Sequence, residues 1–278
     1  MSRKRNFKTM LENQWNQGKF VCVGLDSELS KIPEAARRLS PCETVLGFNK
    51  GIVETTKNLV CAYKLNIAFY EALAGGGLQI LCRTIEFINV VAPHVPVILD
   101  CKRADIGNTN RGYVTEVFDW LKADAITVHP YLGREALQPF LEEENKGIIV
   151  LCRTSNPGAG EFQDLLVGGS MPLYQVVARK VAKEWNSKGN CAVVVGATYP
   201  EELAQIRGIV GDMPILIPGI GKQGGDVEKT IKAGKDSRGK GVVISSSRGI
   251  IFASNGPDFA EAAFEETKKL HNEILKYL

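Results

Sequence analysis

Three of the charged side chains in one short segment of the sequence are spaced so that they could act together. Asp100 and Lys102 are two positions apart at the end of the strand-like run 97–100, and Asp105 follows three residues later. Because side chains at i and i+2 of a strand point to the same face, Asp100 and Lys102 are expected to face one space at the strand's carboxyl end. Carboxylates beside a lysine hold it charged and aimed without a surplus of positive charge. The pattern therefore indicates a site organised around one ammonium group.

A cluster of surface salt bridges is the structural alternative for this segment. Such pairs contribute only about 0 to 1 kcal/mol each, which is a weak reason to place three charges beside a buried strand. Asp105 lies past the strand, in a loop or a first helical turn that Asn108 or Thr109 could cap. We therefore expect Asp105 to be free to reach away from its own strand, towards a neighbouring chain.

Eight short runs rich in apolar and β-branched residues are spread along the chain, with helix-like segments between them. They span residues 20–25, 61–65, 97–100, 125–128, 148–152, 192–195, 215–217 and 242–245. Apolar strands that alternate with helices predict a parallel sheet covered on both faces, and eight such units in about 250 residues fit a closed (β/α)8 TIM barrel. We expect one α/β domain over residues 1–278, with residues 1–19 as an N-terminal helical extension. A doubly wound open sheet is the alternative.

Polar residues fall at the carboxyl end of nearly every one of these runs, where a barrel of this kind carries its chemistry. In chain order they are Asp26, Lys64, Asp100, Lys102, His129, Thr154, Ser155, Gln223 and Arg248. A histidine at such a rim is more often a satisfied structural residue than an acid or base, so His129 is not counted as catalytic. Asp26 could instead cap a helix, and Ser155 lies in a turn-like Ser-Asn-Pro-Gly sequence.

Two segments after the last two runs are predicted to bind an anion. Residues 218–226 are rich in glycine and contain Gln223, and residues 245–249 end in Arg248 and Gly249. They supply backbone N–H groups, an amide and a guanidinium group in the place where barrels of this kind bind phosphate.

Composition narrows the class of protein. The net charge of +3 is too small to indicate nucleic acid binding, although it suits a small anionic substrate. Seven cysteines occur without a Cys-x-x-Cys pair and mostly in apolar runs, so they are expected to be reduced thiols in a cytoplasmic protein.

No apolar stretch approaches the roughly 18 residues that span a bilayer, and the N-terminus lacks the apolar core of a signal peptide. Its apolar residues share one helical face, which we expect to pack on the domain: Phe7, Met10, Leu11 and Trp15.

From residue 20 to residue 255 the chain resembles orotidine 5'-phosphate decarboxylase of the longer microbial type. The motifs that carry the resemblance are Gly24-Leu25-Asp26, Ala62-Tyr63-Lys64-Leu65-Asn66, the run from Asp100 to Thr109, Ser155-Asn156-Pro157-Gly158-Ala159, and the loop 219–226 with Arg248. The resemblance implies a homodimer that converts orotidine 5'-monophosphate to uridine 5'-monophosphate and carbon dioxide in de novo pyrimidine biosynthesis. It implies neither a metal nor an organic cofactor.

The resemblance also implies catalytic roles at four positions. Lys102 would deliver a proton to C6 of the pyrimidine as carbon dioxide leaves. Lys64, Asp100 and Asp105 would complete the charged network, with Asp105 reaching into the site of the partner subunit.

The remaining positions would bind substrate. Asp26 and Thr109 match contacts to the ribose hydroxyls, with Thr109 also coming from the partner chain. Ser155 matches a contact to the pyrimidine, and Gln223 and Arg248 match the phosphate contacts. Segments 27–46 and 161–185 read as long loops that short members of the family lack, and no second catalytic domain is visible, so we expect a single-function enzyme.

Three other functions remain as alternatives. A magnesium-dependent phosphosugar decarboxylase would share the Asp-x-Lys-x-x-Asp run, but it would have a carboxylate where this chain has Lys64. A Schiff-base aldolase could use Lys64 or Lys102, although flanking carboxylates favour a charged lysine over the neutral amine that this chemistry needs. A phosphoribosyl-binding protein without activity is the third.

Overall fold

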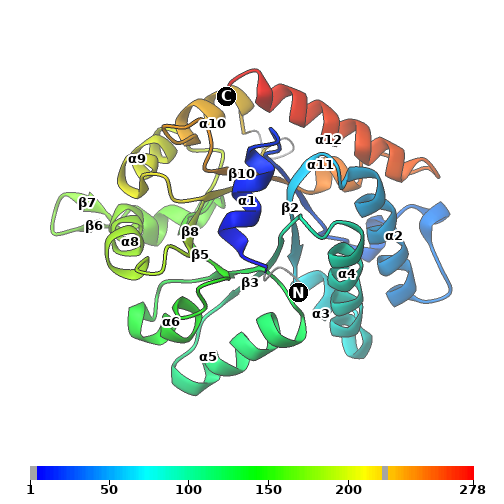
Figure 1. Ribbon diagram of the computed structural model, residues 1–278, viewed down its shortest axis with the longest axis horizontal. Coiled ribbons are helices and arrows are strands. Elements are labelled where there is room, and N and C mark those ends of the chain that lie inside the picture. Colours follow the sequence, from blue (N-terminus) through cyan, green and yellow to red (C-terminus); the bar gives the residue numbers. More distant parts are fainter. Residues whose placement is uncertain (1–4, 221–224) are drawn as a thin grey trace.

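Eight parallel strands close into a barrel (Figure 1). The computed structural model describes residues 5–220 and 225–278. The ring runs β1-β10-β9-β8-β5-β4-β3-β2, and it closes where Val21 pairs with Ile244 and Val23 with Ser246. The strands are β1 (Val21–Gly24), β2 (Val60–Asn66), β3 (Val97–Arg103), β4 (Ala125–Val128), β5 (Gly147–Arg153), β8 (Cys191–Val195), β9 (Ile215–Pro218) and β10 (Val242–Ser246). The prediction of a single-domain (β/α)8 barrel is confirmed, and the open doubly wound sheet is wrong.

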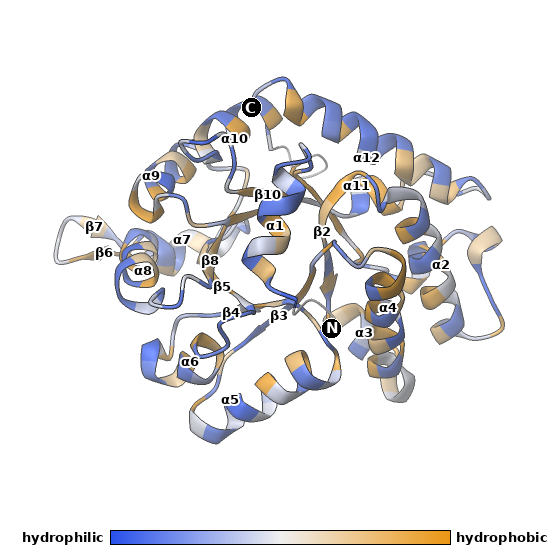
Figure 2. Ribbon diagram, in the orientation of Figure 1, coloured by the Kyte–Doolittle hydropathy of each residue, from blue (hydrophilic) through white to orange (hydrophobic). Residues whose placement is uncertain are grey.

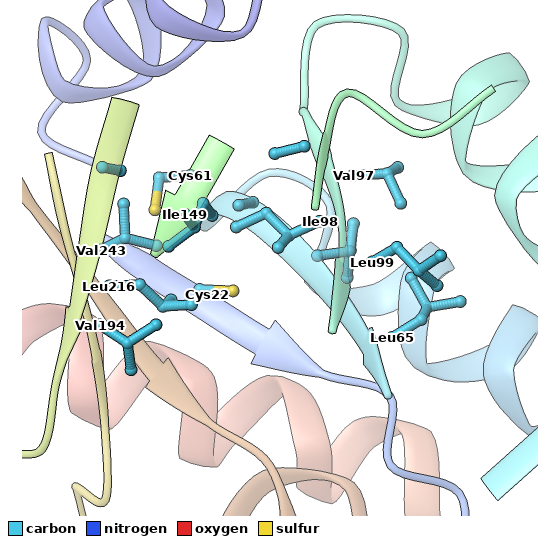
Figure 3. Close-up of a cluster of buried hydrophobic side chains, with 14 of the residues drawn as sticks. Cys22, Cys61, Leu65, Val97, Ile98, Leu99, Ile149, Val194, Leu216 and Val243 are labelled. Carbon is cyan, nitrogen blue, oxygen red and sulfur yellow. The ribbon is translucent and has the colours of Figure 1, made fainter. Parts of the chain in front are cut away.

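The strands read as apolar runs because both of their faces are buried. Every residue of β1, β4, β8 and β10 is buried, by side chains inside the barrel on one face and by helices on the other. Figure 3 shows part of this core, where side chains from several strands meet, among them Cys22, Cys61, Ile149, Leu216 and Val243. All seven cysteines are free thiols, as predicted. No helix in the described part of the chain is long and apolar enough to cross a bilayer.

Helices surround the ring of strands. In Figure 2 they carry both hydrophobic and hydrophilic residues, whereas the strands are mainly hydrophobic. The longer ones are α2 (Pro41–Thr56), α4 (Gly77–Val91), α5 (Gly107–Val114), α6 (Gly133–Leu141), α8 (Leu173–Lys180), α9 (Pro200–Val210), α10 (Val227–Gly234) and α12 (Phe259–Leu275). π-Helical turns η4 (Thr115–Trp120) and η6 (Val181–Trp185) extend α5 and α8. Short elements are η1 (Leu29–Lys31), η2 (Glu34–Ala36), α3 (Ala68–Glu71), η3 (Ala74–Gly76), η5 (Pro157–Ala159), α7 (Gly160–Gln163), the hairpin β6 (Leu166–Val167) with β7 (Met171–Pro172), and α11 (Arg248–Ile251).

The N-terminal helix α1 (Phe7–Trp15) covers one end of the barrel (Figure 1). Its predicted apolar face is buried, namely Phe7, Met10, Leu11 and Trp15. Trp15 Nε1 donates to the Val242 carbonyl at 2.9 Å, and Gln14 Nε2 donates to the His94 carbonyl at 2.8 Å. These partners lie at or just before the amino ends of β10 and β3. The helix therefore closes the amino end of the barrel and leaves the carboxyl end for a site.

The two segments expected to be long loops are largely helical, so that prediction is wrong. Within 27–46, η1 and η2 lead to α2, whose N-cap Ser40 accepts a hydrogen bond from the Glu43 N–H at 3.2 Å. Pro41 follows as the first helical residue, a combination that starts helices. Within 161–185, the β6–β7 hairpin is followed by α8 and η6. Both segments are part of the barrel's outer layer.

Candidate active site

Four charged side chains meet at the carboxyl ends of β1, β2 and β3. Lys64 Nζ lies 3.2 Å from Asp100 Oδ2 and 3.5 Å from Asp26 Oδ1. Lys102 Nζ lies 2.6 Å from the other oxygen of Asp100, Oδ1. Asp100 therefore bridges two ammonium groups, and the cluster contains two positive and two negative charges. We call these four residues the charged cluster.

The charged cluster is buried at one end and open at the other. Burial disfavours the charged form of Asp100, but Lys64, Lys102 and two hydrogen bonds outweigh it and lower its pKa to about 2. Burial likewise opposes the charge on Lys64, yet the carboxylates of Asp26 and Asp100 raise its pKa above the ordinary value. The side chain of Lys64 is 7% exposed and that of Lys102 is 47% exposed. The cluster thus holds Lys64 inside the protein and presents Lys102 to the mouth of the barrel.

The backbone around Lys102 differs from the regular strand that the sequence pattern predicts. Strand β3 continues past Asp100 to Arg103, and its register with β4 shifts between Leu99 and Arg103. Lys102 has a φ of 48°, in the left-handed region. Asp100 and Lys102 do face each other, but an irregular strand end brings them together rather than the simple alternation of side chains.

Thr127 in β4 is a residue of this site that sequence reasoning missed. Its hydroxyl donates to Asp100 Oδ1 at 2.8 Å and accepts from the backbone N–H groups of Cys101 and Lys102, both at 3.0 Å. The only signal in the sequence was a lone hydroxyl-bearing residue within the otherwise apolar run 125–128.

Asp105 and Thr109 lie apart from the charged cluster. The Asp105 carboxylate accepts a hydrogen bond from the Ile106 N–H at 2.7 Å, and nothing in residues 5–220 or 225–278 joins it to Lys102. Thr109 is exposed on α5. The expectation that Asn108 or Thr109 caps this helix is wrong, because α5 begins at Gly107 with Ile106 as its N-cap.

Buried Asn110 orders the loop that carries Asp105. Its side-chain oxygen accepts from the Asp105 N–H at 2.8 Å, and its Nδ2 donates to the carbonyls of Asp105 and Ala136, both at 2.6 Å. Two of these hydrogen bonds hold the loop at Asp105, and the third ties it to α6.

The loops after β9 and β10 meet the charged cluster at a small cavity of about 100 Å³. Asp26 and Lys64 line one side of it, and Gly219, Arg248 and Gly249 line the other. Gln223, which was predicted to bind the phosphate, lies outside the described residues. The cavity connects the buried end of the charged cluster with the predicted anion-binding loops.

Gly24 allows the β10 loop to approach β1 closely. A Cβ at this position would lie 2.8 Å from the Cβ of Ser247, which is too close for any other residue. The glycine of the Gly24-Leu25-Asp26 motif therefore sets the spacing between Asp26 and the loop that carries Arg248.

Ser155 follows β5 and packs against the end of β8. A Cβ on Gly196 would lie 2.8 Å from the Ser155 Cβ, so the two backbones are in close contact. Just before it, Arg153 is 3% exposed, which sequence reasoning also missed. Arg153 lies 3.0 Å from Asp164 and 3.3 Å from Glu202, and its guanidinium is 4.4 Å from the centre of the Tyr199 ring.

Within the described residues, no hydrogen bond or ion pair joins His129 to the charged cluster; its backbone N–H donates to the Arg103 carbonyl at 3.3 Å. In the described part of the chain, no three His, Cys, Asp or Glu side chains are grouped so that they could hold a metal ion.

Comparisons with known proteins agree on one family. The family model described as orotidine 5'-phosphate decarboxylase / HUMPS matches residues 19–263. A Cellvibrio japonicus protein named orotidine 5'-phosphate decarboxylase is 48% identical over 270 residues, which cover 97% of this chain and 98% of that protein. A protein of the same name from Azoarcus sp. is 48% identical over 260 residues, covering 93% of this chain and 94% of its own length.

Solved structures give the same result. Leishmania donovani OMP decarboxylase superposes with a TM-score of 0.82 at 34% identity, covering 96% of this chain and 99% of that one. Leishmania donovani UMP synthase superposes with a TM-score of 0.84 at 35% identity, covering 96% of this chain but only 57% of the longer protein.

Proposed function

The chain belongs to the orotidine 5'-phosphate decarboxylase family, and from that premise we propose that Lys102 protonates the carbon from which orotidine 5'-monophosphate loses carbon dioxide. The protein is a carbon–carbon lyase of pyrimidine biosynthesis that forms uridine 5'-monophosphate and carbon dioxide. The observation that carries the proposed mechanism is the Asp100 carboxylate between two ammonium groups, one buried and one open to the barrel mouth.

In the proposed step, the bond between C6 and the carboxylate breaks and its electron pair stays on C6. A proton from Lys102 Nζ moves to C6, which gives the product, and the neutral amine regains a proton from water. Lys102 is suited to this step because its side chain is half exposed, while its ammonium is held 2.6 Å from Asp100. An ammonium aimed at the place where negative charge develops stabilises the transition state.

Asp100 adds a smaller effect, because it destabilises the bound substrate rather than stabilising the transition state. A substrate carboxylate about 4 Å from Asp100 would be disfavoured by about 4 kcal/mol at an effective dielectric near 20, and this repulsion disappears when carbon dioxide leaves. Enzymes lower barriers by about 8 to 23 kcal/mol, so the larger share falls to Lys102 and to binding energy from the phosphate.

We assign Asp26 to the ribose hydroxyls, Ser155 to the pyrimidine, and Gln223, Arg248 and Gly249 to the phosphate. Asp26 and Arg248 line the same cavity, which supports this assignment. A ribose 5'-phosphate in it could reach Asp26 with its hydroxyls and Arg248 with its phosphate. Lys64, which contacts both carboxylates of the charged cluster, would orient them rather than react.

The working form is proposed to be a cytoplasmic homodimer in which Asp105 and Thr109 act in the partner's site. Both residues lie outside the charged cluster of their own chain. Beside them, the loops after β3 and β4 expose large apolar side chains, with Ile106 61% exposed and Tyr131 86% exposed. Exposed apolar groups next to polar residues are typical of a protein interface.

The raised pKa of Lys64 argues against an aldolase that uses Lys64 as its nucleophile, since a Schiff base needs a neutral amine.

The direct test follows the absorbance of orotidine 5'-monophosphate with the wild type and with Lys102→Ala, both with excess chelator. We expect turnover by the wild type and a loss of at least about 10³-fold in Lys102→Ala. Lys180→Ala, which removes an exposed lysine of α8, is the matched control and should keep wild-type activity. Equal turnover by wild type and Lys102→Ala would remove Lys102 from the mechanism.

The dimer is tested by mixing two inactive variants, Lys102→Ala and Asp105→Ala. If Asp105 acts across the interface, half of the mixed dimers' sites contain both wild-type residues, so random exchange should restore up to about a quarter of wild-type activity. If Asp105 acts within its own chain, mixing restores nothing.

A further inference from the structure

Thr127 lies in the middle of the active-site geometry without reaching the barrel mouth. It is the third residue of β4 and is 1% exposed. A hydroxyl can donate one hydrogen bond and accept two. Thr127 uses all three, through the Asp100 carboxylate and the N–H groups of Cys101 and Lys102.

The two N–H groups belong to the part of β3 where pairing with β4 is interrupted. Residues 100–102 have no register partner in β4, between the pairs Leu99–Ile126 and Arg103–Val128. Within this interruption Lys102 has a φ of 48°, a conformation that residues other than glycine rarely adopt. Such a backbone persists only where its surroundings hold it, and the Thr127 hydroxyl binds the amide of Lys102 itself.

The same hydroxyl also fixes the side chain to which Lys102 is paired. Asp100 Oδ1 accepts from Thr127 at 2.8 Å and from Lys102 Nζ at 2.6 Å, while its other oxygen faces Lys64. One oxygen atom of Thr127 therefore holds both the backbone of Lys102 and the carboxylate that receives its ammonium group.

We propose that Thr127 is a positioning residue that aims the Lys102 ammonium at the reacting carbon. It does so by holding the left-handed backbone of Lys102 and the Asp100 carboxylate with one buried hydroxyl. This inference rests on the proposed role of Lys102. A purely structural role is the competing interpretation, in which the hydroxyl only satisfies buried polar groups.

The test compares Thr127→Val, which keeps the shape but removes the hydroxyl, with Thr127→Ser, which keeps the hydroxyl. In Thr127→Val we expect kcat to fall by about 10²-fold, as for a catalytic group displaced by about 1 Å, while the Kd of uridine 5'-monophosphate stays within about threefold. In Thr127→Ser we expect kcat to return to within about fivefold of wild type, because both N–H groups and Asp100 keep their partner. Equal losses of kcat and product affinity, or no recovery in Thr127→Ser, would overturn the proposal.

Thr267→Val is the matched control. Its buried hydroxyl donates to the Ala263 carbonyl at 2.7 Å inside α12, away from the barrel mouth, so kcat should not change. If Thr127→Val does not fold, Thr127→Cys takes its place, since a thiol is a weak donor and acceptor. A fall in its kcat with unchanged product affinity supports the proposal, and wild-type kcat contradicts it.

A double variant separates this inference from the proposed function. If Thr127 acts through Lys102, adding Thr127→Val to Lys102→Ala should change the residual kcat by less than about threefold. A further 10²-fold loss in the double variant would show that Thr127 acts independently of Lys102. Full activity of Lys102→Ala alone would overturn the proposed function, and this inference with it.

Discussion

Two buried cations at the carboxyl end of the barrel have similar ion pairs but different positions relative to the barrel mouth. Lys64 at the end of β2 and Arg153 at the end of β5 are each paired with two carboxylates, and their side chains are 7% and 4% exposed. The carboxylate shared by Lys64 belongs to a neighbouring strand and also binds a second cation, Lys102. The carboxylates of Arg153 come instead from the outer layer, near α7 and in α9.

The two cations also differ in whether aromatic rings cover them. The Arg153 guanidinium lies over the rings of Tyr174 and Tyr199, at 5.4 Å and 4.4 Å from their centres, which leaves it no open side. Among the described residues no aromatic ring lies over the Lys102 ammonium group, and the side chain is 47% exposed. A buried ion pair therefore becomes available for chemistry where a strand aims it into the barrel mouth, and it serves as an anchor where helices and rings enclose it.

Of the two buried cations, Lys64 should have the larger effect when it is replaced, as in Lys64→Met. Removing this cation leaves Asp26 and Asp100 close together and partly desolvated, so stability should fall by about 3–5 kcal/mol and kcat/KM by about 10²- to 10³-fold. Urea unfolding and steady-state kinetics measure the two losses. A value of kcat/KM within threefold of wild type would contradict the comparison.

Arg153→Met should lower kcat/KM and stability less than Lys64→Met does, and its structural effect should be local. Asp164 and Glu202 are more exposed than Asp100, so we expect a loss of about 2 kcal/mol and less than a tenfold fall in kcat/KM. The segment 154–172 should become more sensitive to limited proteolysis, because its tie to α9 is lost. An activity loss as large as that of Lys64→Met would place Arg153 in the chemistry instead.

The pH dependence of stability should have opposite signs for Asp100 and for Glu202. The pKa of Asp100 is lowered to about 2, so its contribution is present above the unfolded value near 4 and is lost as pH falls towards 2. This amounts to roughly 2 kcal/mol. In Asp100→Asn the free energy of unfolding should therefore decline less between pH 5 and pH 2.5 than in the wild type. An unchanged decline would mean that Asp100 is not held ionised by its neighbours.

Glu202 should show the smallest effect, in the opposite direction. Burial raises its pKa despite the attraction of Arg153, so its contribution is greatest below the unfolded value and is lost as pH rises through the folded value. Glu202→Gln should therefore make the acid decline slightly steeper, with activity unchanged. Chemical denaturation at several pH values measures both slopes, and a shallower decline in Glu202→Gln would contradict the assignment.

The sequence was sufficient for the barrel because its signals are local. Continuous apolar strands, helical spacing between them and polar residues at strand ends all follow from short stretches of chain. The grouping of Asp26, Lys64, Asp100 and Lys102 followed from one topological rule, that parallel strands in a barrel end at the same rim.

The features that escaped prediction depend on partners far along the chain. Thr127 meets Lys102 across 25 positions, and Arg153 meets Glu202 across 49. The left-handed backbone at Lys102 breaks the two-residue period on which strand reasoning depends. The helix in segment 27–46 differs from these features, because its start at Ser40-Pro41 is a local signal that the sequence does contain.

The docking of α1 has a consequence for the order of events during biosynthesis. Trp15 is hydrogen-bonded to Val242, 227 positions later, so α1 has no complete binding surface until β10 has been translated. The apolar face of α1 therefore stays without its partner strand while the chain is synthesised, at about 5–20 residues per second. We infer that closure of the barrel and docking of α1 on its amino end are late, coupled events in folding.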